Sequence, residues 1–132
     1  ADIDHFKRIN DDHSHGIGDR VLERVARIFG ERILGADLVA RYGGEEFLFC
    51  FVGSDATEVE RRCEDLRLSL EGTDWTTLSS GLRVTMSIGL ATCNGESEAS
   101  ALLDRADTCL YQAKRLGRNR VVTENTRRSG TL

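Results

Sequence analysis

The sequence of 132 residues contains no apolar run long enough to cross a lipid bilayer and no internal repeat. It also lacks an excess of basic residues, because 22 aspartates and glutamates outnumber 18 lysines and arginines and give a net charge of −4. This charge argues against binding of a nucleic acid polymer, and the lack of an apolar span predicts no membrane contact by this segment. The composition is that of a globular domain, and 132 residues can bury a core without disulfides or structural metal ions.

Two further features are missing. The four cysteines form no C-x-x-C pair, and their apolar neighbours are typical of buried thiols in the reducing cytoplasm. The sequence has neither an initiator methionine nor a signal peptide, and the acidic residue Asp2 stands almost at its start. We therefore expect a cytoplasmic segment of a longer protein, either a soluble or a membrane-bound one.

Hydrophobic periodicity predicts both helices and strands. Apolar residues recur at helical spacing over 19–34, over 55–70 with Asp55 as cap, and over a third segment that opens at Ser97 or Ser100 and ends at Leu116. Strands are predicted at 38–42 and 47–52, which flank a glycine-rich turn as a β-hairpin, and at 75–78, 82–90 and 120–123. The fold class is α+β, an α/β sandwich in which helices flank a central, mostly antiparallel sheet. We assign residues 1–124 to the domain and 125–132 to a polar tail, with frayed order from Glu124 onward.

Acidic residues gather at two places. Asp2 and Asp4 form a D-x-D pair whose carboxylates share one side of an extended chain, and Glu45 and Glu46 stand at the tip of the predicted hairpin. Together they could hold Mg²⁺, which prefers oxygen ligands and completes its shell with water and phosphate. The alternative is that both groups are solvated surface acids. The metal site requires the strand at Asp2 to pair beside the hairpin.

Four blocks of the sequence resemble the GGDEF family in order and spacing. The first two are Asp2-Ile3-Asp4-His5-Phe6-Lys7 with Asn10-Asp11, and His15-Gly16-Ile17-Gly18-Asp19. The third is Arg41-Tyr42-Gly43-Gly44-Glu45-Glu46-Phe47, and the fourth comprises Val84 to Gly89, Ala106 to Lys114 and Gly117-Arg118-Asn119. The resemblance covers nearly the whole chain, so we expect the catalytic domain of a diguanylate cyclase.

The resemblance implies a palm-like nucleotide-cyclase fold that condenses two GTP molecules into cyclic di-GMP and two pyrophosphates. Each protomer of a homodimer would bind one GTP, and an upstream sensor or regulatory domain would control the enzyme. Carried over by position, the metal ligands for Mg²⁺ or Mn²⁺ are Asp2, the Ile3 carbonyl, Glu45 and Glu46, and the catalytic residues are Glu45 and Glu46. The implied substrate-binding residues are Phe6, Lys7, Asn10, His15, Asp19, Lys114 and Arg118.

Structural roles compete with several of these assignments. Asn10 and Asp19 are residue types that cap helices, whereas the family motif makes them readers of the guanine edge. Lys114 and Arg118 lie four residues apart near a predicted helix end, where basic side chains complement the helix dipole as well as phosphates. Two rival functions follow from the same fold: a catalytically silent module that binds GTP or cyclic di-GMP, and a protein-interaction scaffold without nucleotide.

The sequence departs from the family pattern in three places. Many members carry an inhibitory product site, R-x-x-D; here Asp37 keeps the acid, but Leu34 replaces the arginine, which predicts weak or absent product inhibition. Ser14 stands where the family usually has glycine. The helix and most of the first strand that precede Asp2 in the family are absent from this sequence, so we do not expect the fragment to be active by itself.

Overall fold

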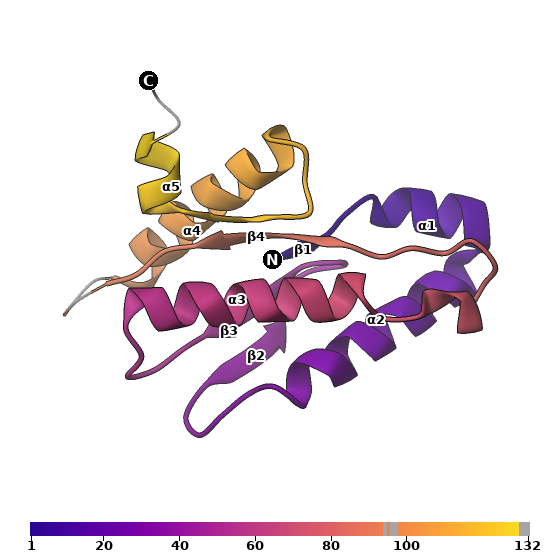
Figure 1. Ribbon diagram of the computed structural model, residues 1–132, viewed down its shortest axis with the longest axis horizontal. Coiled ribbons are helices and arrows are strands. Elements are labelled where there is room, and N and C mark those ends of the chain that lie inside the picture. Colours follow the sequence, from indigo (N-terminus) through magenta and orange to yellow (C-terminus); the bar gives the residue numbers. More distant parts are fainter. Residues whose placement is uncertain (94, 96–97, 130–132) are drawn as a thin grey trace.

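The computed structural model describes residues 1–93, 95 and 98–129. Its strands are β1 (Asp2–Ile3), β2 (Leu38–Arg41), β3 (Phe47–Cys50), β4 (Met86–Leu90) and β5 (Val121–Thr123). Its helices are α1 (Phe6–His13), α2 (His15–Gly30), α3 (Ala56–Glu71), α4 (Ala99–Arg115) and α5 (Glu124–Ser129), and a 3-10 turn, η1, spans Trp75–Thr77. Figure 1 shows the predicted α+β arrangement, in which helices flank a small sheet.

The short strand β1 joins the two parts of the sheet. It pairs antiparallel with β4, where Asp2 lies opposite Ser87, and a β-bridge links Asp2 to Glu46 in the hairpin turn, directly before β3. β2 and β3 form the predicted antiparallel hairpin. β4 and β5 pair in parallel, and α4 makes the long crossover that a parallel connection requires. The resulting order, β2-β3-β1-β4-β5, places β1 centrally and confirms that it pairs beside the hairpin.

Alternation along β1 and β4 separates two faces of the sheet. Ile3 and Met86 are buried in the main core with side chains of α2 and α3, which include Val25, Phe29, Leu66 and Leu70. Phe29 meets Phe47 edge to face, with ring centroids 5.4 Å apart. The next residue of β4, Ser87, therefore points to the opposite face, toward α4, where Cys109, Ala113 and Val122 form a second buried cluster.

Gly89 sets the distance between α4 and the sheet. A Cβ atom added there would lie 2.2 Å from both the carbonyl oxygen of Ala106 and the amide nitrogen of Leu110. Two backbone atoms of α4 thus occupy the place of a side chain, which requires glycine at this position.

Helix boundaries differ from the predictions where local capping overrides periodicity. α2 begins at His15 rather than at residue 19, because Ser14 caps it by accepting the Ile17 amide at 3.3 Å. Ser14 has φ 99°, a region that favours glycine, so the serine adopts an uncommon backbone conformation in exchange for this cap. α3 begins at Ala56 with Asp55 as its cap, as predicted. α4 begins at Ala99, one residue before Ser100, and Ser97 lies outside the described residues.

Two predicted strands are wrong in type or length. Residues 75–77 form a 3-10 turn rather than a strand, because Asp74 caps the turn and the Trp75 indole donates to the Leu70 carbonyl at 2.9 Å. Residues 82–85 alternate in burial, but the strand β4 begins only at Met86. The segment that pairs with β4 turns into α1 after Asp4, whose amide donates to the Thr85 carbonyl, so residues before Thr85 have no strand from this segment to pair with.

The expected burial of the cysteines and the expected order of the C-terminal residues are each wrong in part. Cys63 and Cys109 are buried as expected, but Cys50 and Cys93 are exposed. Residues 124–129 form a short helix where frayed order was expected. Among the described residues, no helix combines the length and apolar character that a membrane span needs.

Candidate active site

The acidic hairpin tip and β1 come together through backbone hydrogen bonds. The Ile3 amide donates to the Glu45 carbonyl at 3.1 Å, and the Phe47 amide donates to the Ala1 carbonyl at 2.9 Å. Because bridged residues on adjacent strands point to the same face, Asp2 and Glu46 project together, on the side that also carries Ser87. Two acidic groups 44 positions apart in sequence thus share one end of the sheet.

Asp2 is buried and paired with a lysine. Only 6% of the residue is exposed, and its carboxylate accepts from the Lys114 ammonium at 2.7 Å. Lys114 is in the last turn of α4, so this ion pair ties the helix end to β1. Asp2, a predicted metal ligand, is thus in direct contact with Lys114, which is predicted to bind phosphate.

Asp4 has a structural role instead of a ligand role. Its carboxylate accepts from the Ser87 hydroxyl at 2.6 Å, the Thr85 hydroxyl at 2.8 Å and the Asn119 amide at 3.0 Å. These donors occupy both carboxylate oxygens of a residue that is 7% exposed. The D-x-D pair is therefore divided, with Asp4 holding the fold beside Asp2.

The hairpin tip is held from within. The Glu46 carbonyl accepts from the Tyr42 amide at 2.8 Å and closes the turn, and the Arg41 guanidinium donates to the carbonyls of Gly43 and Gly44 at 3.1 and 3.0 Å. Glu45 and Glu46 are half-buried. Within the described ranges, no cluster of three or more acidic, histidine or cysteine side chains is arranged to hold a metal ion. The available donors of Asp2, Glu45 and Glu46 are all oxygen, which matches the ligand preference of Mg²⁺ and Mn²⁺.

The predicted guanine-reading residues do not cap helices. His5 occupies the N-cap position of α1 without a side-chain hydrogen bond, and Ser14 caps α2, whereas Asn10 lies inside α1 and Asp19 in the second turn of α2. Asn10 packs over Gly18, where an added Cβ would lie 1.8 Å from its Oδ1 atom. A larger residue at 18 would displace Asn10, so this glycine holds α1 and α2 at close approach.

Asp19 lines a cavity of about 400 Å³ between α2 and the hairpin. Glu23 of α2 and Arg41 of β2 add charged groups to its wall, and Leu22 and Phe47 add apolar ones. His15 and Lys7 are exposed at the starts of α2 and α1, and Phe6 is half-buried against the main core. The cavity and these helix starts offer both apolar and charged contacts to a ligand.

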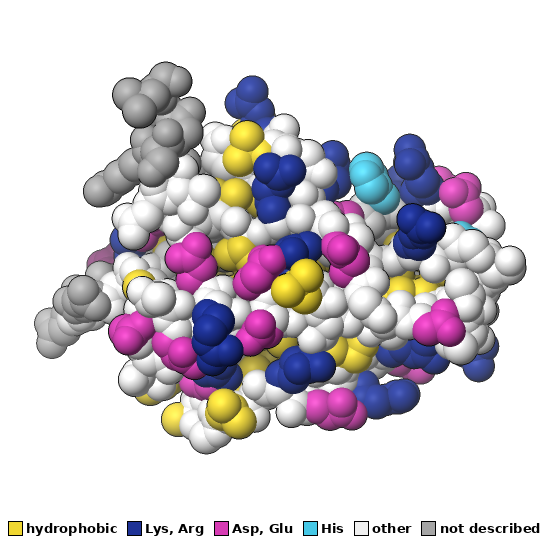
Figure 2. All heavy atoms as spheres, in the orientation of Figure 1, with side chains coloured by type: hydrophobic (Ala, Val, Ile, Leu, Met, Phe, Trp, Pro, Cys, Tyr) yellow, Lys and Arg dark blue, Asp and Glu magenta, His cyan; other side chains and the backbone are white. Residues whose placement is uncertain are grey.

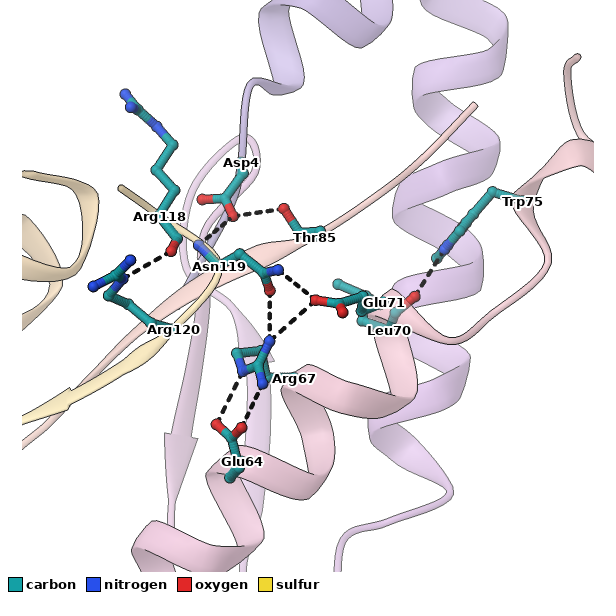
Figure 3. A network of polar contacts seen from close by, with 10 residues as sticks. All are labelled: Asp4, Glu64, Arg67, Leu70, Glu71, Trp75, Thr85, Arg118, Asn119 and Arg120. Carbon is teal, nitrogen blue, oxygen red and sulfur yellow. Dashed lines mark hydrogen bonds and ion pairs between the residues drawn. The ribbon is translucent and has the colours of Figure 1, made fainter. Parts of the chain in front are cut away.

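Arg118 lies beyond α4, which ends at Arg115. Both residues lie near the helix end, as expected, but only Lys114 is in the last turn of α4, so a helix-dipole role applies only to Lys114. Arg118 has φ 66°, and within the described part of the chain its guanidinium forms neither a hydrogen bond nor an ion pair. Figure 3 shows this side chain pointing away from the polar contacts around Asn119.

The carboxylate of Asp37, the acidic residue of the product site described for the family, already has hydrogen-bond partners within the chain. Its carboxylate accepts from the Val52 amide at 2.9 Å and from the Arg62 guanidinium at 2.7 Å. The Val52 hydrogen bond first, and Arg62 second, lower the pKa of Asp37 from its ordinary value. Leu34 is 64% exposed and provides no donor at the position of the family arginine.

Comparison with known proteins identifies the fold that carries this site. A family model described as "Diguanylate cyclase, GGDEF domain" matches residues 1–120. This chain belongs to the GGDEF family. The match covers every predicted site residue, from Asp2 to Arg118.

Related GGDEF proteins are longer than this chain. Diguanylate cyclase A of Treponema denticola is 42% identical over 121 residues, which are 91% of this chain and 33% of that protein. The response regulator PleD of Caulobacter vibrioides is 42% identical over 124 residues, 92% of this chain and 27% of that protein. The chain thus spans about a third or less of the length of these relatives.

Solved GGDEF structures have the same fold. The GGDEF domain of DgcB from Caulobacter crescentus, in complex with c-di-GMP, superimposes with a TM-score of 0.85 at 36% identity, over 92% of this chain and 73% of that one. The active GGEEF domain of a diguanylate cyclase from Vibrio cholerae gives a TM-score of 0.82 at 30% identity, over 92% and 78% of the two chains. The mixed sheet flanked by helices is therefore the GGDEF domain fold.

Sequence reasoning missed the residues that support the site. Asp4 and Asn119 act through contacts between distant parts of the chain, whereas Arg41 braces the hairpin through carbonyls two and three residues away. Asn119 donates its backbone amide to Asp4 across 115 positions. The D-x-D pair marked Asp4 as a candidate metal ligand, and Arg41 and Asn119 were marked as parts of the family motif.

Proposed function

We propose that this GGDEF domain is a diguanylate cyclase, which condenses two GTP molecules into cyclic di-GMP and two pyrophosphates. The observation that supports it most strongly is the convergence of Asp2, Glu46 and Lys114 around β1, from three separate sequence blocks. Acidic and basic groups at one end of a sheet suit a triphosphate with a divalent cation. The family likeness supplies the reaction class.

In the proposed reaction, the 3′-hydroxyl oxygen of one GTP attacks the α-phosphorus of the other. A P–O bond forms, the bond to pyrophosphate breaks, and Glu45 takes the hydroxyl proton. In the second step, the 3′-hydroxyl of the other nucleotide attacks the α-phosphorus of the first, which releases the second pyrophosphate and closes the ring. Asp2, the Ile3 carbonyl, Glu45 and Glu46 would hold Mg²⁺ or Mn²⁺, which neutralises phosphate charge when bound. Lys114 and Arg118 would hold the phosphates, together with Phe6 and Lys7 at the start of α1.

The guanine base is assigned to the neighbourhood of Asn10 on α1 and Asp19 on α2. Asn10 and Asp19 would read its edge, with His15 nearby, because neither Asn10 nor Asp19 is used as a helix cap. Asp19 also faces the cavity beside the hairpin. Each chain supplies one set of these residues, so two GTP molecules call for a homodimer whose half-sites face each other.

Regulation and location follow as parts of the same proposal. The domain would work in the cytoplasm, under a sensor or regulatory domain elsewhere in a longer protein, since it spans about a third or less of its relatives. One structural relative, SiaD of Pseudomonas aeruginosa, was solved with its activator SiaC, at a TM-score of 0.84. Product inhibition through residues 34–37 should be weak, because Leu34 offers no donor and Arg62 occupies Asp37.

The decisive experiment is product formation by the protein at its natural length. Chromatography of reactions with GTP and Mg²⁺ should detect cyclic di-GMP, and Glu45→Gln should reduce its rate by about a hundredfold or more, the range expected for loss of a general base. Exposed Glu31 at the end of α2 provides the control, since Glu31→Gln should leave the rate unchanged.

The same assay separates the rival functions. A protein that binds GTP without making product, and whose binding survives Glu45→Gln, would be the catalytically silent module. Absence of any thermal shift with GTP and Mg²⁺ would instead indicate an interaction scaffold. The four intact acidic positions around β1 and the hairpin favour the cyclase.

A further inference from the structure

The turn after α4 has an unusual backbone. Gly117, Arg118 and Asn119 have φ values of 118°, 66° and 45° in succession. Residues with side chains rarely adopt positive φ, and such conformations persist where surrounding contacts impose them. Two of these three residues carry side chains, so the contacts of this turn determine where Arg118 can point.

Asn119 is held by three groups from two other parts of the chain (Figure 3). Its backbone amide donates to the Asp4 carboxylate at 3.0 Å. Its side-chain oxygen accepts from the Arg67 guanidinium at 2.7 Å, and its side-chain nitrogen donates to Glu71. Both ends of the amide are therefore fixed from α3, while Asp4 fixes the backbone.

Arg67, which contacts Asn119, is itself held by two acidic residues of α3. On α3 it pairs with Glu64, three residues earlier, and with Glu71, four residues later at 3.1 Å. Its side chain is only 12% exposed. The guanidinium, with five donors in a fixed fork, can satisfy both acids and still donate to the turn.

Arg61 provides an internal comparison on the same helix. It pairs with Glu58 and Asp65 at the same spacings, but its side chain is 60% exposed and its hydrogen bonds in the described chain stay within α3. Figure 2 shows acidic and basic side chains interspersed over the face that α3 forms. Arg67 differs from this surface pattern by its burial and by its bond to Asn119.

We propose that Arg67 and Asn119 are positioning residues that hold Arg118 ready for the phosphates of GTP. The inference rests on the proposed function, which assigns Arg118 to the triphosphate, and it extends the site to α3, an element with no proposed ligand residue. The Arg118 amide also donates to the Ala113 carbonyl at 2.9 Å, so α4 fixes one side of the turn and α3 the other. Because the backbone of the turn is fixed before binding, only the Arg118 side chain has to be ordered when the ligand arrives, and less conformational entropy is lost.

The test measures affinity for GTP with a methylene group between its α- and β-phosphorus atoms, so that turnover does not interfere. With Mg²⁺ and the protein at its natural length, Arg67→Met should raise the dissociation constant about three- to tenfold, the effect of one hydrogen bond. The matched variant Arg61→Met should leave it unchanged. Asn119→Gly, which accepts positive φ and keeps the amide bonded to Asp4, should reproduce the rise if Arg67→Met folds poorly.

A double-mutant cycle distinguishes positioning from general stabilisation. In an Arg118→Ala background, Arg67→Met should cause no further loss of affinity, because the side chain it positions is gone. An equal loss in both backgrounds, or equal behaviour of Arg67→Met and Arg61→Met, would overturn the inference. Cyclic di-GMP formation by the wild-type protein tests the proposed function separately, since the affinity measurements need no turnover.

Discussion

Replacing Gly89 with alanine should force α4 away from the sheet. The new Cβ would lie 2.2 Å from two backbone atoms of α4, whereas ordinary contacts begin at 3.4 Å. The helix would have to move by about 1.2 Å, the difference between these distances. Neither backbone atom can rotate aside as a side chain would, so the whole contact between β4 and α4 bears the strain.

This strain should be large for one methyl group. Overpacking of a core commonly costs 1–3 kcal/mol, and we expect about 3 kcal/mol at Gly89 because backbone atoms receive the clash. For a domain of this size, the cost corresponds to a melting temperature lower by about 10 °C. Since α4 carries Lys114, the displacement should also disturb its 2.7 Å ion pair with Asp2.

Urea unfolding and thermal melting followed by circular dichroism provide the assay. Gly30→Ala is the matched control, because an added Cβ at this last residue of α2 meets nothing within 4 Å. Its stability should be unchanged or up to about 1 kcal/mol higher, since alanine favours helix. A Gly89→Ala protein within about 0.5 kcal/mol of the parent would refute the close-approach argument.

Three other predictions concern the surface around the site. The lowered pKa of Asp37 means that its stabilising contribution is present above its ordinary value of 3.8 and is lost as pH falls through the lower folded value. Asp37→Asn should therefore flatten the fall in unfolding free energy below about pH 4 in urea titrations, and an unchanged acid limb would contradict this. Leu34→Arg should strengthen cyclic di-GMP binding in calorimetry, whereas no gain would count against the product-site explanation. Exposed Cys50 and Cys93 should react with a thiol reagent in the native protein, whereas Cys63, whose pKa burial raises to about 12, should react only after unfolding.

Short-range patterns predicted the parts of this fold that depend on local sequence. The hairpin at residues 38–50 follows from two apolar runs around glycines, and α3 follows from periodicity and a capping aspartate. The pairing of β1 beside the hairpin was stated as a condition for the metal site, and the Asp2–Glu46 bridge meets it. The resemblance to the GGDEF family then indicated the class of reaction.

Features that arise from distant partners escaped prediction. Residues 75–77 look like a strand by composition, but Asp74 and the Leu70 carbonyl hold them in a 3-10 turn. Arg67 looks like another surface arginine of α3 in the sequence, but its burial and its contact with Asn119, 52 positions away, set it apart. Such contacts depend on how elements pack, which no window of the sequence contains.

The Asp2–Lys114 and Asp4–Asn119 contacts also bear on how the molecule folds. They join groups 112 and 115 positions apart, so each closes a loop that includes most of the domain. Closing such loops costs entropy that local contacts cannot offset, and topologies rich in distant contacts fold slowly. During synthesis, Asp2 and Asp4 can therefore make these contacts only after Lys114 and Asn119, more than a hundred residues later, have left the ribosome.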